Sequence, residues 1–179
     1  MLKITVPDRE FYDETNNEFF IKKGATFYIE HSLISISKWE STWEMPFLSH
    51  KEKTKAQLTD YVRCMTLTQN IPDYIYDMLT QDNFRDINKY INSKKTATTI
   101  KTSDHKKNNQ IITSELIYYF MVALNIPFEC QKWHLNRLLT LIQVCNEKNK
   151  PSKKMNRRDL NRRNSATNAA RRARSGSRG

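Results

Sequence analysis

Residues 18–48, EFFIKKGATFYIEHSLISISKWESTWEMPFL, contain the point at which the chain changes from strand-like to helix-like patterning. The first half is rich in β-branched and aromatic residues, and its KKGA segment predicts a turn between two extended arms, with Gly24 in a backbone conformation that other residues resist. In the second half, Ser37 and Glu40 have the spacing of a helix capping box, and Pro46 is expected to end that helix. Strands followed by helices predict an α+β fold.

The flanking segments extend this pattern. LKITV at the N-terminus predicts another strand, which Pro7 ends because proline cannot donate to a ladder. Thr54 and Thr80 precede apolar residues at helical spacing, and Pro72 suits the first turn of a further helix. TSELIYYFMVALNI is apolar on nearly every face and predicts a central helix at about 113–124.

The expected organisation is one domain with a basic tail. Residues 1–36 form a small N-terminal antiparallel β-hairpin or sheet, and residues 37–148 form a predominantly helical body with a polar loop at 93–110. Residues 149–179 have few large apolar side chains and are expected to be disordered. Lys148–Gly179 contains twelve Lys or Arg residues and one acidic residue, so the formal charge of +11 lies there and the body is neutral.

Residues 126–150, IPFECQKWHLNRLLTLIQVCNEKNK, contain two of the three cysteines and one of the four histidines. Cys130 and His134 share a face if this stretch is one helix, which raises the hypothesis of a thiol nucleophile beside an imidazole. Cys145 would lie about 22 Å further along that helix, so a zinc site lacks convergent ligands. No third catalytic group is evident, and leucines follow the same stripe, so the stretch is interpreted as a core wall with ordinary thiols.

Other chemistries are disfavoured by the residues present. Glu40 and Glu44 form an acidic pair without a third ligand, which indicates a solvated helix face. His31, His50 and His105 are isolated and expected at the surface, and glycine is too scarce for a phosphate-binding loop. No catalytic residue, metal site or cofactor is therefore expected, and the chain is predicted not to be an enzyme.

The sequence also bears on the compartment. Three cysteines without framework spacing and the lack of an export signal predict a cytosolic protein with reduced thiols. The longest uncharged stretch is 13 residues, short of the roughly 20 that span a bilayer, so no membrane contact is expected.

Aromatic residues of the body are candidates for binding a partner. Trp39 and Trp43 are four residues apart, and they either anchor their helix in the core or present exposed rings to another chain. Tyr118, Tyr119 and Trp133 are further candidates for an apolar groove.

Arginine clusters in the tail suit phosphates or an acidic protein surface. No aromatic residues lie among them, so nucleic-acid contacts would be electrostatic and independent of sequence. The candidate electrostatic contacts are Arg157, Arg158, Arg162, Arg163, Arg171, Arg172 and Arg174.

Four stretches, SISKWESTWEMPFL, VRCMTLTQNI, IPFECQKWHLNRLLTLIQVCN and NAARRARSGSRG, resemble tail assembly chaperones of long-tailed bacteriophages that infect Gram-positive hosts. The resemblance covers most of the chain and implies no catalysis. It implies a helical, self-associating protein of the host cytoplasm that coats the tape measure protein until tail tube subunits replace it, and that is absent from the mature virion. The alternative is a small basic protein that binds nucleic acid through its arginine-rich tail.

Overall fold

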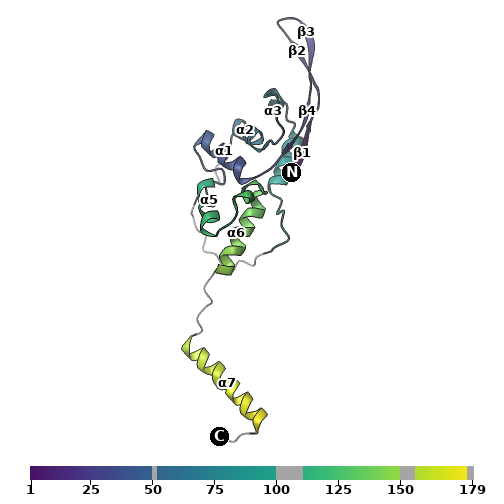
Figure 1. Cartoon of the computed structure of the whole chain (residues 1–179). Coiled ribbons are helices and arrows are strands. Elements are labelled where there is room, and N and C mark those ends of the chain that lie inside the picture. The colour runs from purple at the N-terminus through teal and green to yellow at the C-terminus, as the bar shows by residue number, and fades with distance from the viewer. Residues whose placement is uncertain (50–51, 100–110, 150–155, 177–179) are drawn as a thin grey trace. The chain divides into compact units, whose positions relative to one another are not determined.

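The computed structural model describes residues 1–49, 52–99, 111–149 and 156–176, which belong to two compact units, Met1–Lys148 and Asn149–Gly179. The first unit begins with strands and continues with helices, which confirms the α+β class (Figure 1). Its strands are β1 (Leu2–Val6), β2 (Arg9–Asp13), β3 (Glu18–Lys22) and β4 (Ala25–Ile29). Its helices are α1 (Leu33–Trp43), α2 (Lys55–Met65), α3 (Tyr74–Asp77), α4 (Gln81–Ile91), α5 (Ser114–Ala123), a 3-10 helix (Phe128–Lys132) and α6 (Leu135–Asn149).

The four strands form one long antiparallel hairpin. β1 pairs with β4 and β2 pairs with β3 in a continuous register, from Leu2 opposite Ile29 to Asp13 opposite Glu18. The hairpin turn lies at residues 14–17, so the turn predicted at KKGA is wrong. β3 and β4 do extend on either side of KKGA, but they follow one another along the same side of the hairpin and do not pair with each other.

Gly24 lies at the junction between the two strand pairs. Its amide donates a hydrogen bond to Asp8 Oδ1 at 2.6 Å, and a Cβ atom at this position would lie 2.0 Å from the Val6 carbonyl oxygen. Glycine is therefore required for the close approach of two backbone segments, and not for a left-handed turn. Pro7 ends β1, as predicted.

Complete capping boxes fix three of the helix starts among the described residues. Thr54 and Thr80 cap α2 and α4, as predicted, and the structure shows that each cap is a complete capping box. α1 begins five residues earlier than predicted, because its N-cap is Ser32 and not Ser37, and the hydroxyl of Ser35 completes the box. A serine in place of the usual Glu or Gln hid this start in the sequence. The helix ends ahead of Pro46, as expected.

The core lies between the β1–β4 part of the hairpin and the helices beside it (Figure 1). Inward-facing residues of β1 and β4 alternate with exposed ones, as expected for strands with one buried face. Each buried apolar side chain contributes about 1.5–3 kcal/mol through removal from water. The largest fully buried side chains include Phe27, Leu33, Ile36, Trp39, Tyr61, Ile75, Ile117, Met121 and Leu135.

The helix predicted at 113–124 is present as α5, but it is not central. Ile117 and Met121 on one side are buried, whereas Tyr119 and Val122 on the other side are 63% and 60% exposed. Before this helix, residues 93–99 contain no helix or strand, and the rest of the predicted 93–110 loop lies outside the described residues.

The second unit contains one helix, α7 (Arg157–Ser175), whose side chains are all exposed. The tail was expected to be disordered; its described residues form a single helix with no buried side chain, and the remaining residues of the tail lie outside the described ranges. Alanine and arginine are strong helix formers, and Gly176 ends the helix in a left-handed conformation with φ of 64°.

Glu40 is buried, which corrects the prediction of a solvated face, while Glu44 is exposed as expected. Oε1 of Glu40 accepts a hydrogen bond from the Phe47 amide at 2.8 Å, and Oε2 accepts one from the Ser114 amide at 2.7 Å. Ser114 is the first residue of α5, so the carboxylate satisfies an otherwise unpaired amide at the positive end of that helix. One side chain thereby joins α1, the segment that follows it and the start of α5.

We expect Glu40→Ala to lower the free energy of unfolding by about 2–4 kcal/mol, because two buried amides lose their acceptor. Urea unfolding followed by circular dichroism measures this loss. Ser41→Ala is the control, since Ser41 is exposed on the same helix and the change should fall within about 0.5 kcal/mol of wild type. Equal stabilities for the two variants would contradict the structural role of Glu40.

Candidate partner-binding surface

Trp39 is a core residue and is not available to a partner. Its side chain is fully buried, and Nε1 donates a hydrogen bond to the Gln57 carbonyl oxygen at 2.9 Å. The ring also packs against Trp43 and Phe47, with centroid distances of 6.2 and 5.1 Å. Of the two alternatives for this tryptophan, the anchor in the core is the one that the structure supports.

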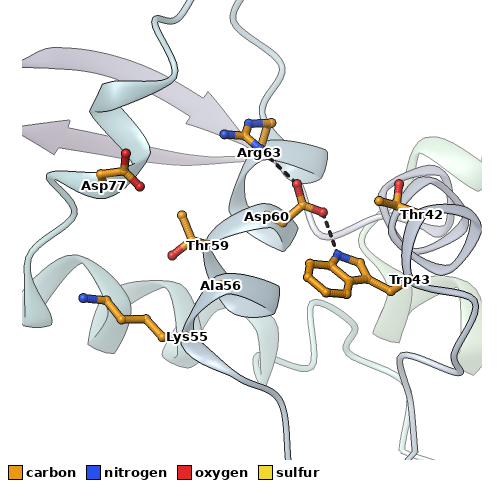
Figure 2. Close-up of a pocket in the computed structure, with 8 residues that line it drawn as sticks. All are labelled: Thr42, Trp43, Lys55, Ala56, Thr59, Asp60, Arg63 and Asp77. Carbon is orange, nitrogen blue, oxygen red and sulfur yellow. Dashed lines mark hydrogen bonds and ion pairs between the residues drawn. The ribbon is translucent and has the colours of Figure 1, made fainter.

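Trp43 is half-buried and lines a pocket of about 460 Å³ between α1, α2 and α3 (Figure 2). Its indole Nε1 donates to Asp60 Oδ2 at 2.9 Å, and Arg63 Nη1 binds the other oxygen of the same carboxylate at 3.1 Å. Lys55 and Asp77 lie on the opposite side of the pocket in Figure 2. The indole N–H is therefore already used within the protein, and the pocket walls carry both signs of charge.

Tyr118 and Trp133 are half-buried and held by neighbouring side chains. The Tyr118 hydroxyl donates to Gln131 Oε1 at 2.9 Å, and the Arg137 guanidinium lies 3.9 Å from the centroid of the Trp133 ring. Both rings contribute to the packing of the 3-10 helix and the start of α6, so only part of each is open to a partner.

The exposed apolar side chains of this region lie on α5 and beside it. Tyr119, Val122 and the nearby Phe128 are more than half exposed, at 63%, 60% and 54%. The residues before the helix add to this group, with Ile111 at 61% and Ile112 at 41%. We call these five residues the α5 surface.

Of the five residues of the α5 surface, only Tyr119 is among the binding candidates that the sequence indicates. The signal is the apolar character of TSELIYYFMVALNI on nearly every face, from which the sequence predicts a central helix. A helix that is apolar all round also fits a position with one face in the core and the other free for a partner.

Cys130 and His134 do not share a helix, which corrects the premise of the nucleophile hypothesis. Cys130 is buried in the 3-10 helix, and His134 precedes α6. Burial raises the pKa of the Cys130 thiol, with the Glu129 carboxylate adding to the effect. A nucleophilic thiol needs the opposite shift. The core-wall interpretation holds for Leu135, Leu138 and Ile142, which are buried.

His31 and His134 form a buried pair, so the surface position expected for His31 is wrong, while His50 and His105 lie outside the described residues. The rings of His31 and His134 are 5.1 Å apart, and His31 Nδ1 lies 2.6 Å from the Tyr61 hydroxyl. Burial, together with the charge of His134, lowers the pKa of His31 to about 3, and burial also lowers the pKa of His134.

Within the described ranges, no three His, Cys, Asp or Glu side chains are grouped as metal ligands would be. No helix in these ranges has the length and apolar character of a membrane span. Comparison of the chain with models of known protein families, with curated proteins and with solved structures finds no match.

The buried histidines predict a loss of stability on mild acidification. Their folded-state pKa values lie below the unfolded value of about 6.5, so the unfolded state binds more protons below that pH. We expect the contribution of His31 to be complete above pH 6.5 and to fall by about 2 kcal/mol by pH 5, which urea unfolding across this window measures. His31→Gln should reduce the slope of the unfolding free energy against pH by the equivalent of about one proton. An unchanged slope would contradict the low folded-state pKa of His31.

Proposed function

We propose that this chain is a non-enzymatic tail assembly chaperone of a long-tailed bacteriophage, which binds the tape measure protein and keeps it soluble during tail morphogenesis. It would act in the host cytoplasm, give way to tail tube subunits and be absent from the mature virion. The sequence resemblance suggests this role, and the α5 surface supports it because a chaperone for an apolar helical partner needs an exposed apolar surface.

The observation that carries the proposal is the exposed side of α5. Tyr119 and Val122 are three residues apart on α5 and so are neighbours on the helix, and grouped exposed apolar residues mark interaction sites. Along α5, the exposed positions Glu115, Tyr119 and Val122 follow helical spacing, while Ile117 and Met121 hold the other side in the core. Tyr119 and Val122 are therefore presented on a helix whose position is fixed.

An amphipathic helix is the partner that this surface suits best. Two helices pack by placing the side-chain ridges of one into the grooves of the other. Tyr119 and Phe128 offer large, rigid rings that lose little conformational entropy on binding. A tape measure protein is a long helical rod, and its apolar stripe would supply anchors at i, i+3, i+4 and i+7.

A second candidate function is nucleic-acid binding, and α7 favours it. This helix carries seven arginines and one aspartate. At 100° per residue, Asn161, Asn164 and Asn168 fall on one side of it, together with Arg157 and Arg172. Such a side suits phosphate oxygens and the polar edges of bases.

We expect the double variant Tyr119→Ser and Val122→Ser to bind a tape measure fragment at least about tenfold more weakly, because two apolar contacts are lost. The fraction of co-expressed fragment that stays soluble gives a first measurement, and titration of the purified fragment gives the dissociation constant. Tyr28→Ser is the matched control, since Tyr28 is 47% exposed on β4. Equal losses for the control and the double variant would contradict a specific α5 surface.

Removal of residues 151–179 separates the two functions. The truncated chain should still keep the fragment soluble, because apolar contacts persist at salt concentrations that screen exposed charges beyond about 10 Å. It should lose any strongly salt-dependent affinity for generic DNA or RNA, which a filter-binding series at several salt concentrations measures. A truncated chain that cannot solubilise the fragment, combined with a full-length chain that binds nucleic acid tightly, would replace the proposal with the second candidate.

A further inference from the structure

The tip of the hairpin exposes an unusual amount of apolar surface. We call β2, β3 and their connecting turn the arm, and Figure 1 shows it extending beyond the helices of the first unit. Phe19, Ile21, Tyr12 and Phe20 on the arm are 69%, 65%, 49% and 42% exposed. A two-stranded ribbon alone is marginally stable in water, and each of its strands has one edge of unpaired amides and carbonyls.

Side chains of like charge also lie opposite one another at both ends of the arm. Arg9 lies opposite Lys22 at one end, and Asp13 lies opposite Glu18 at the other. Like charges directly opposite in a ladder are destabilising. Both ends of the arm therefore hold a like-charge pair that a neighbouring group of opposite sign would stabilise.

The strand β3, with the sequence EFFIK, is complementary to itself in antiparallel pairing. When Phe20 is placed opposite Phe20 of a second copy, Glu18 falls opposite the partner's Lys22 and Phe19 falls opposite the partner's Ile21. We propose that the arms of two copies of this chain pair along β3 in this register, which forms a four-stranded antiparallel sheet in the order β2-β3-β3-β2.

The proposed sheet resolves each unfavourable feature of the arm. The acidic pair Asp13–Glu18 of one copy lies beside the partner's basic pair, Lys22 with Arg9, and the two-fold symmetry repeats this contact at the other end. The four phenylalanines at positions 11 and 20 form a row across the sheet centre. The free edges of both β3 strands become hydrogen-bonded.

The opposite edge, β2, is a poorer pairing strand. Its sequence REFYD would also bring Arg9 opposite the partner's Asp13. However, both oxygens of Asp13 already accept hydrogen bonds within the turn, from the Thr15 amide at 2.9 Å and from Asn16 Nδ2 at 2.8 Å. Pairing through β2 would also set Glu10 opposite an aromatic ring, whereas pairing through β3 matches apolar residues with one another.

Charge reversal tests the register. Glu18→Lys and Lys22→Glu each place like charges across the proposed interface, while each converts a like-charge pair inside the hairpin into an attractive one. Glu18→Lys therefore tests the dimer without weakening the hairpin. Lys22→Glu also removes an ammonium that lies over the rings of Phe11, Phe20 and Tyr74, so recovery of the dimer in the double variant is what excludes loss of the hairpin for that change. In the full-length chain, we expect the dimer dissociation constant from sedimentation velocity to rise about tenfold or more for each single variant, and to return to the wild-type value or below for the double variant.

Disulfide trapping tests the symmetry axis independently. Phe20→Cys should form a disulfide-linked dimer on oxidation, whereas Phe11→Cys, on the opposite strand of the same hairpin, should remain at the level that the native cysteines give in the wild-type chain. A wild-type chain that is monomeric at all concentrations, a double variant that does not recover dimerisation, or trapping through position 11 would each overturn the proposal. The inference does not rest on the proposed function, because the α5 surface takes no part in this contact.

Discussion

Glu40 brings a carboxylate into the interior, and the first unit is arranged so that both oxygens have donors. The two donors, the amides of Phe47 and Ser114, come from segments 7 and 74 residues away in sequence. A buried carboxylate is tolerated only when it is fully hydrogen-bonded, so α1, the segment after it and α5 must be correctly placed together. The position of α5, and with it the direction of its exposed side, depends on this contact.

The fixed position of α5 affects how its exposed side can bind a partner. Because its inner side is held by core packing and by Glu40, Tyr119 and Val122 can bind a partner without the entropy cost of first ordering the helix. The arm differs, since it continues from β1 and β4 and most of its own strand residues are exposed. The two exposed apolar regions therefore suit different partners: a helix at the α5 surface and a second copy of the chain at the arm.

Local signals in the sequence predicted the local features of the fold. Caps at Thr54 and Thr80, the end of β1 at Pro7 and the approximate bounds of α5 all follow from the chemistry of neighbouring residues. The hairpin turn was misplaced because Gly24 was interpreted as a turn residue, whereas its role depends on a backbone segment 16 residues away. The burial of Glu40 and the pairing of the two buried histidines depend on contacts between residues far apart in the sequence. The spacing of apolar residues along the chain carries no information about such contacts.

The candidate site was only partly predictable for the same reason. Tryptophan spacing placed Trp39 and Trp43 on one helix but could not show that Trp39 is enclosed by the turn after it. Val122 and Phe128 were not predicted, because apolar residues on and next to a core helix are usually buried. Which of them stay exposed depends on how the other helices pack around that helix.

Hydrogen–deuterium exchange of the full-length chain, with and without a soluble tape measure fragment, tests most directly whether the α5 surface is the binding site. We predict slower exchange at residues 111–128 when the fragment is bound, with the arm unchanged at the same protein concentration. Slower exchange confined to α7 or to the arm, with residues 111–128 unaffected, would contradict the account.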